Sequence, residues 1–144
     1  MGYAQGELLP PYRNEREEKE AKKILRYIEG HPKIVRASIA MDIWNYEKHF
    51  GKDNFPREIE IVGNWLEMCV SETIDFCLEI GAEVSANPEY VISFHGKNKR
   101  GKEAFLRKTI MWPDFYERTI EKTPNGLIFR QNKVLTKRNM LASA

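Results

Sequence analysis

Residues 57–80 form the most apolar part of the chain, and they indicate where its core lies. Side chains that share one helical face recur there at spacings of three and four: Val62, Trp65, Leu66, Cys69, Thr73, Phe76, Cys77 and Ile80. This spacing predicts a central helical region. Ser71 is placed to cap a second helix if the region breaks beside it, and Gly81 ends the region.

Two more helices are expected before this region. Asn14 is a good N-cap for a helix over residues 14–29, which carries glutamates in its first turn and stops at Gly30. A second helix is expected from Lys33 to His49. Residues 1–13 contain Gly2, Gly6 and the pair Pro10-Pro11, so we expect an irregular, extended N-terminal arm, and a packed strand is the alternative that the sequence leaves open.

The periodicity changes after Gly81. Residues 89–95 are rich in β-forming side chains and predict a strand, and residues 96–102 predict a loop. Residues 103–112 fit either a strand that pairs back on 89–95 or a helix. A short helix over 114–122, a turn at Pro124-Asn125-Gly126, a strand over Leu127–Phe129 and a mobile basic tail over 130–144 complete the prediction.

These elements predict a single α+β domain over residues 1–144. Its N-terminal three- to four-helix unit would be followed by a small antiparallel hairpin or sheet. Three helices and then a hairpin with a cationic tip match the order of elements in winged-helix proteins.

Composition narrows the class of protein. Of the 144 residues, 42% are hydrophobic and 31% are charged, which excludes a mainly disordered chain. No apolar run reaches the length of a membrane span, and no apolar segment of a signal peptide follows Met1. Two cysteines do not make a disulfide framework. We therefore expect a soluble, cytoplasmic protein with no membrane partner.

The charge is distributed unevenly along the chain. Residues 31–90 carry five basic and eleven acidic side chains, whereas residues 91–144 carry twelve basic and four acidic side chains. A basic segment of this kind suggests an anionic partner, and nucleic acid is the commonest one. The alternative is that the basic third packs beside the acidic middle of the same chain.

The candidate nucleic-acid-binding residues are the cations of the 96–102 loop and of the segments after it: Lys97, Lys99, Arg100, Lys102, Arg107, Lys108, Arg130, Lys133, Lys137 and Arg138. Aromatic residues are interleaved with them, namely Phe94, Phe105, Trp112 and Phe129. Aromatic faces can stack on unpaired bases, although aromatics at strand spacing are more often part of a core.

The same loop also contains the letters G-x-x-x-x-G-K of a phosphate-binding loop, from Gly96 to Lys102. Glu103 stands where such a loop needs Ser or Thr to ligate magnesium, so nucleotide hydrolysis is disfavoured. Residues 71–81, the counterpart of a recognition helix, are acidic, which disfavours a helix in the DNA major groove. Backbone contacts by the hairpin and the tail are the expected mode.

No catalytic, metal-binding or cofactor-binding residues are assigned. Cys69 and Cys77 are eight positions apart, about 12 Å along a helix, and are interpreted as small buried hydrophobes. His31, His49 and His95 lie in three different segments without a ligand spacing.

The leading hypothesis is therefore a small, non-catalytic nucleic-acid-associated protein, with the type of nucleic acid and the oligomeric state left open. The first alternative is a protein-interaction module, such as a regulator or a subunit of a larger complex, which uses its acidic helical face or its basic tail. The second alternative is an enzyme that acts on a phosphorylated substrate near the basic loop.

Overall fold

The structure, a computed structural model, describes residues 2–5, 11–30, 34–37, 57–111 and 117–132. Within these residues the chain forms the strands β1 (Gly2–Gln5), β2 (Ile34–Ala37), β3 (Glu58–Asn64), β4 (Glu83–Ala86), β5 (Val91–Ile92), β6 (Arg118–Thr123) and β7 (Gly126–Gln131). The α-helices are α1 (Glu15–Glu29), α4 (Ser71–Ile80) and α5 (Lys99–Met111). A π-helical turn, η1 (Leu66–Val70), precedes α4, and a 3₁₀ turn, η2 (Pro88–Tyr90), precedes β5.

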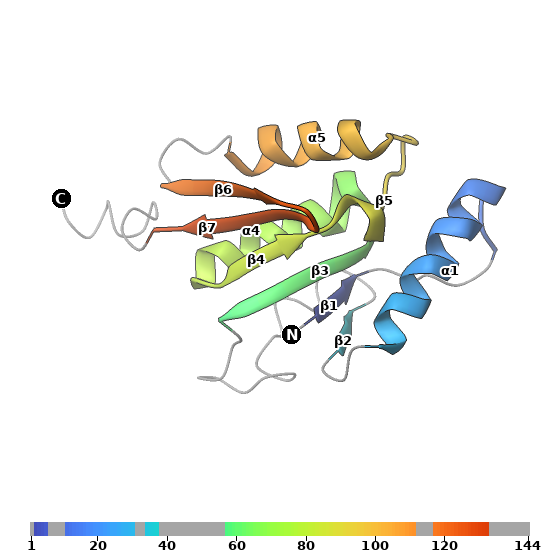
Figure 1. The fold of residues 1–144 in the computed structure, drawn as a ribbon, viewed down its shortest axis with the longest axis horizontal. Helices are drawn as coiled ribbons and strands as arrows, with labels where there is room; N and C mark the ends of the chain where they lie inside the picture. Colours follow the sequence, from blue (N-terminus) through green and yellow to red (C-terminus); the bar gives the residue numbers. More distant parts are fainter. Residues whose placement is uncertain (1, 6–10, 31–33, 38–56, 112–116, 133–144) are drawn as a thin grey trace.

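The strands form one mixed sheet in the order β2-β1-β3-β4-β7-β6 (Figure 1). The neighbours from β2 to β4 are parallel, and β7 joins β4 and β6 antiparallel. β4 and β5 pair with successive parts of β3, because Glu60 lies opposite Ser85 and Asn64 lies opposite Ile92. The carboxyl ends of β3 and β5 therefore meet at one edge of the sheet.

The predicted fold class is wrong in its architecture. Helices and strands are both present, but the helices alternate with strands instead of forming an N-terminal bundle, and the sheet is not a small hairpin. The predicted wing does not exist, because residues 99–111 form α5. A winged-helix arrangement is therefore excluded.

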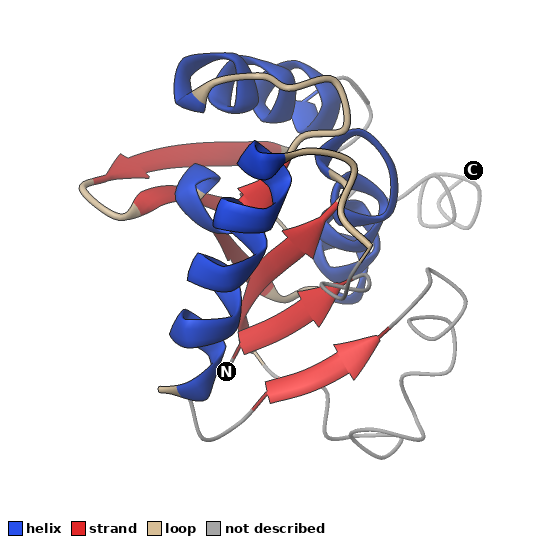
Figure 2. Ribbon diagram, turned by 90° about the vertical axis from the view of Figure 1, so that its right-hand side faces the viewer, coloured by secondary structure: helices blue, strands red, loops and turns tan. Residues whose placement is uncertain are grey.

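Helix α1 covers one face of the sheet, and α4 lies on the opposite side (Figure 2). This first helix is confirmed with its predicted ends: the side chain of Asn14 accepts a hydrogen bond from the Glu17 N–H, and Gly30 forms the C-cap. Its apolar stripe packs on two side chains from the sheet, Val62 and Ile92.

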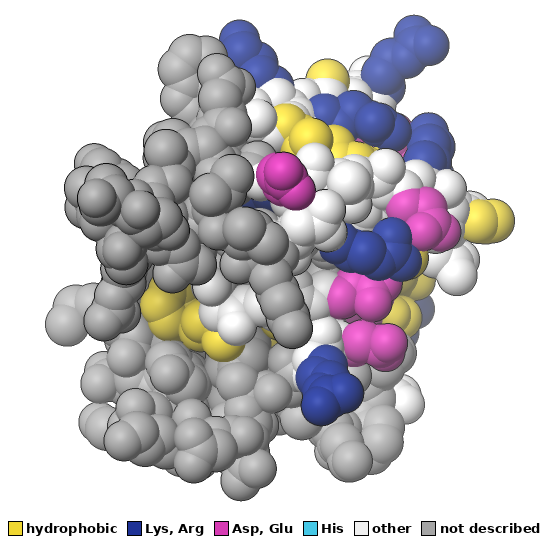
Figure 3. Space-filling view, turned by 90° about the vertical axis from the view of Figure 1, so that its left-hand side faces the viewer, with side chains coloured by type: hydrophobic (Ala, Val, Ile, Leu, Met, Phe, Trp, Pro, Cys, Tyr) yellow, Lys and Arg dark blue, Asp and Glu magenta, His cyan; other side chains and the backbone are white. Residues whose placement is uncertain are grey.

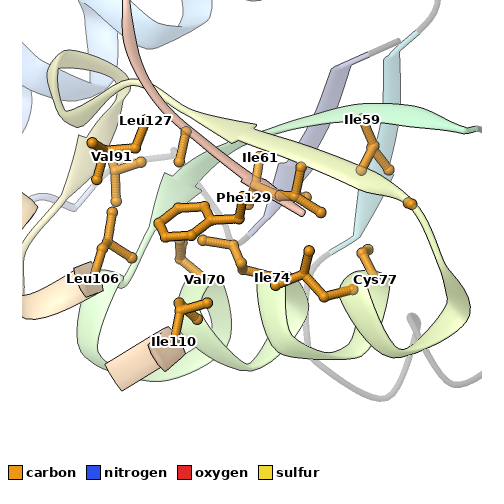
Figure 4. Packing of buried hydrophobic residues seen from close by; sticks show 14 of the residues in the cluster. Ile59, Ile61, Val70, Ile74, Cys77, Val91, Leu106, Ile110, Leu127 and Phe129 are labelled. Carbon is orange, nitrogen blue, oxygen red and sulfur yellow. The ribbon is translucent and has the colours of Figure 1, made fainter. Parts of the chain in front are cut away.

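The main core lies between the sheet and the helices α4 and α5 (Figure 4). In β3, Ile59 and Ile61 face this core while Val62 faces α1, so residues 58–64 form a strand buried on both sides. The prediction of a helix from residue 57 is wrong for this part. The predicted break near Ser71 and the end at Gly81 are confirmed by the bounds of α4, although the Ser71 hydroxyl donates to the Met68 carbonyl and does not cap the helix.

The last elements agree in part with the predictions. Residues 103–111 are helical, which decides between the two interpretations of that segment. The turn at residues 124 and 125 and the strand after it are confirmed, but residues 118–122 belong to β6 and not to a helix. Pro88–Tyr90 is a 3₁₀ turn, so the predicted strand over 89–95 reduces to β5.

Three further differences concern the N-terminal half and the strand after α4. Gly2–Gln5 is a strand, not irregular chain, and Ile34–Ala37 is a strand where a helix was expected. The rest of that expected helix, residues 38–49, lies outside the described residues. Strand β4 was not predicted. None of the helices in the described ranges is long and apolar enough to cross a membrane.

Candidate functional site

The structure separates the ten predicted cationic residues into three groups. Lys97, Lys102 and Arg130 form ion pairs with carboxylates. Lys99, Arg100, Arg107 and Lys108 lie exposed on α5. Lys133, Lys137, Arg138 and the rest of the predicted tail from residue 133 onward fall outside the described residues.

Lys97 belongs to a polar network that holds the turn after β5. Its Nζ lies 2.9 Å from Oε2 of Glu67, and the same carboxylate accepts from the Ser93 hydroxyl and from the Phe94 N–H. Burial would raise the pKa of Glu67, but the hydrogen bonds from Ser93, Lys97 and Phe94 outweigh it and lower the pKa to about 2. Lys97 therefore neutralises a nearly buried carboxylate.

Lys102 is not available to a ligand. It is buried on α5, and its Nζ lies 2.7 Å from Oε1 of Glu20 and 3.1 Å from the Pro88 carbonyl oxygen. The G-x-x-x-x-G-K letters therefore do not form a phosphate loop, because the lysine points into the contact between α5, α1 and η2.

Arg130 is engaged on the sheet. Its guanidinium contacts Glu121 on β6 at 2.9 Å and Glu83 on β4 at 2.8 Å. The hydrogen bond to Glu121, followed by the charge of Glu83, raises the pKa of Arg130. Here the basic third does pack beside the acidic middle of the chain, which is the alternative that the sequence left open.

The remaining four of the ten cations are exposed on α5. Arg100, Arg107 and Lys108 lie on the side away from the inward-facing Lys102, Leu106 and Ile110, and Lys99 is exposed at the first residue of the helix. Arg100 and Arg107 are seven positions apart, so they lie within about 20° around the helix axis and about 10 Å apart along it. We call Lys99, Arg100, Arg107 and Lys108 the α5 basic face. In Figure 3, Lys and Arg side chains crowd the upper part of the molecule, and lower down they alternate with Asp and Glu.

The start of α5 is unusual in its charge. The Asn98 side chain accepts from the Gly101 N–H, and the Lys102 N–H donates to the Asn98 carbonyl, which closes the first turn. This turn contains Lys99 and Arg100 and no acidic residue. Cations at the positive end of a helix are unfavourable, whereas α1 begins with three glutamates as helix stability prefers.

The interleaved aromatic residues are divided between core and surface. Phe129 is fully buried, and Phe105 packs on the core with Lys97 Nζ 5.1 Å from the centre of its ring. Phe94 is 39% exposed and makes an edge contact with Trp65. Trp112 lies outside the described residues. Only Phe94 among the described members of this set offers an exposed ring.

A shallow pocket of about 730 Å³ lies beside Phe94, where the turn after β5 meets the start of α1. Sequence reasoning did not select Arg13 and Arg16, which line this pocket together with His95. The sequence did contain one signal for this site. Arg13 and Arg16 lie at the positive end of a predicted helix, a position that favours acidic residues.

The cysteines and histidines form no cluster in the described part of the chain. Cys77 is buried, and burial raises its pKa to about 12, but Cys69 is partly exposed in η1, just after the carboxyl end of β3. The interpretation as a buried hydrophobe thus holds for Cys77 alone. No group of His, Cys, Asp or Glu suited to a metal ion occurs within the described ranges, and His31 and His49 lie outside them.

Comparison of the chain with protein-family models, with curated proteins and with solved structures finds no match.

Proposed function

We propose that this chain binds the phosphate backbone of nucleic acid through the α5 basic face. One observation carries the proposal: four exposed cations lie on one helix, and none of them pairs with a carboxylate among the described residues. A polyphosphate favours such a surface, because each neutralised phosphate releases a condensed counterion.

The pairing of the other cations supports this choice. Lys97, Lys102 and Arg130 each have a carboxylate partner within 3 Å, so the chain holds enough acidic side chains to neutralise cations where the fold uses them. At the start of α5, Lys99 and Arg100 lie at the positive end of the helix, where cations are unfavourable. Charges that are locally unfavourable for the fold, and that no carboxylate compensates, are typical of a functional site.

The expected recognition is independent of base sequence. Apart from its cations, the exposed side of α5 carries Ala104, Thr109 and Met111, and it has no Asn or Gln to pair with base edges. Contacts would therefore go to phosphate oxygens. We assign Lys133, Lys137 and Arg138 a supporting role in the proposal, and the two free cysteines are compatible with a cytoplasmic location.

The test compares two variants with the same loss of charge. In the first, the α5 basic face is replaced by serine (Lys99→Ser, Arg100→Ser, Arg107→Ser, Lys108→Ser). In the matched control, four exposed cations of α1 are replaced (Lys19→Ser, Lys22→Ser, Lys23→Ser, Arg26→Ser). Affinity for duplex DNA, single-stranded DNA and RNA of mixed sequence is measured over a range of salt concentrations.

We expect the α5 variant to lose affinity and to flatten the dependence of log affinity on log salt by up to about 3.6 on duplex DNA, since each of four phosphate contacts contributes about 0.9 to the slope. The α1 control should keep most of the slope. Equal losses in both variants would show a general charge effect and overturn the site. Tight binding of a protein partner by a chain that binds no nucleic acid at low salt would favour the interaction-module alternative.

A further inference from the structure

The pocket between α1 and the turn after β5 lies where α/β sheets commonly bind ligands. It is lined by residues 13–16 and by residues 94–96, which follow the carboxyl end of β5. β5 runs parallel to β3, and open α/β sheets bind ligands outside the carboxyl ends of their parallel strands. A volume of about 730 Å³ is in the range of small-molecule sites.

Arg13 forms a fixed planar surface in this pocket. Its Nε donates to Oε1 of the buried Glu17 at 2.6 Å, and one terminal nitrogen donates to the Phe94 carbonyl oxygen at 2.7 Å. The guanidinium lies 3.9 Å from the centre of the Phe94 ring and 4.7 Å from that of Trp65. Its charge is balanced by Glu17, and its guanidinium is held over one face of the partly exposed Phe94 ring.

Arg16 differs from Arg13 because its ion pair is long and its guanidinium makes no hydrogen bond to the described residues. Its nearest carboxylate among the described residues is Glu20, with Oε2 3.8 Å from Nε, and the other oxygen of Glu20 holds Lys102. The guanidinium lies against Gly96, where a Cβ atom would come within 2.2 Å of Nη1. The absent side chain at Gly96 thus leaves room for the Arg16 head group, which can bind an anion with two parallel hydrogen bonds.

The other polar groups of the wall limit the ligand. His95 is exposed and makes an edge contact with Phe94, and Glu15 is the acidic residue in the wall. A ligand that carried negative charge throughout would be repelled by Glu15. The groups instead suit a molecule with one anionic end for Arg16, hydroxyl or amino groups for Glu15, and a planar ring for the side of Phe94 that Arg13 does not cover.

We propose that this pocket binds a nucleoside monophosphate, with its phosphate on Arg16 and its base against Phe94. This site is separate from the α5 basic face and does not depend on nucleic-acid binding there. Two basic residues that follow the turn after β5, Lys97 and Lys102, are paired with Glu67 and Glu20. They therefore do not supply the phosphate contact.

The test is calorimetric titration of the full chain with adenosine monophosphate, adenosine and inorganic phosphate. Arg16→Gln removes the proposed phosphate contact. Arg26→Gln on the same helix is the matched control, since Arg26 is exposed and its Nε lies 3.4 Å from the Lys22 carbonyl oxygen. Phe94→Leu removes the ring, and the α5 serine variant controls for binding at the other cationic surface.

We expect saturable binding of adenosine monophosphate, weaker by about tenfold or more in Arg16→Gln and nearly unchanged in Arg26→Gln. Phe94→Leu should weaken adenosine and its monophosphate alike and leave phosphate unaffected. The proposal is overturned if the monophosphate does not bind, if it binds no better than adenosine, or if Arg16→Gln binds as the native chain does. If only the α5 variant loses binding of the monophosphate, the binding site is on α5 and not in this pocket.

Discussion

Lys102 and Glu20 lie 82 positions apart in the chain, and their side chains join α5 to α1 through a contact of 2.7 Å. The lysine is 5% exposed and the glutamate 23%. The two helices cover different parts of the sheet, so this ion pair fixes the position of α5, and with it the α5 basic face, relative to α1.

Replacing Lys102 with methionine should destabilise the fold by about 1–3 kcal/mol. The substitution keeps most of the volume but leaves Glu20 and the Pro88 carbonyl without the ammonium that they share. Lys99→Met, on the exposed start of the same helix, should change the free energy of unfolding by less than about 0.5 kcal/mol. Urea denaturation measures both, and equal midpoints for the two variants would contradict the structural role of Lys102.

Glu67 should make the stability depend on pH below neutrality. Its pKa in the folded chain is about 2, below the usual 4.5, so ionised Glu67 stabilises the fold fully above about pH 4.5. That contribution falls as the pH drops from 4.5 towards 2. Unfolding free energies of the native chain and Glu67→Gln should differ by on the order of 2 kcal/mol at pH 7 and by less at pH 3. A difference that stays constant with pH would disprove the assignment.

Gly126 should not tolerate a side chain. It begins β7 with φ of 134°, and a Cβ atom there would come within 2.5 Å of the Ala86 carbonyl oxygen and 2.7 Å of the Asn87 Cα. Backbone atoms of β4 cannot move aside cheaply, so Gly126→Ala should cost about 2–4 kcal/mol. Gly30→Ala is the control, because Gly30 has right-handed backbone angles and ordinary contacts. Thermal unfolding should separate the two variants clearly, and similar melting temperatures would refute the close approach.

The two thiols should react at very different rates in the folded protein. Cys77 is buried, with its pKa raised to about 12, whereas Cys69 is partly exposed in η1. A small alkylating reagent at pH 8 should modify Cys69 first and Cys77 only after unfolding. Mass spectrometry of the native chain, Cys69→Ser and Cys77→Ser identifies the site. Rapid modification of Cys77 in the folded Cys69→Ser variant would place that thiol outside the core.

Some elements could be predicted because their signals are local. Helix α1 has its cap at Asn14, its stop at Gly30 and its apolar stripe all within the segment itself. Strand β3 was missed because Val62, Trp65, Leu66 and Cys69 keep helical spacing across the junction between a strand and η1. The alternation of Ile59 and Ile61 with Glu58 and Glu60 was the competing signal, and it favours a strand.

The sequence did not reveal which side of α5 faces the core, because one of the inward-facing residues is charged. Lys102 occupies the position of an apolar side chain one turn before Leu106, so the helical stripe is incomplete in the sequence. The candidate site likewise could be predicted from the sequence only in part. The excess of cations was visible in the composition, but their availability depends on partners far away, such as Glu67 for Lys97 and Glu20 for Lys102.

The parallel pairing of β1 with β3 has a consequence for how the chain folds. Gly2 lies opposite Glu60, so this contact requires closure of a loop of almost sixty residues, whereas β6 and β7 meet through a tight turn. The C-terminal hairpin should therefore form early, and β1 should join the sheet late. Until β1 arrives, the edge of β3 is open to strands of other molecules, so refolding yield should fall steeply as the protein concentration rises.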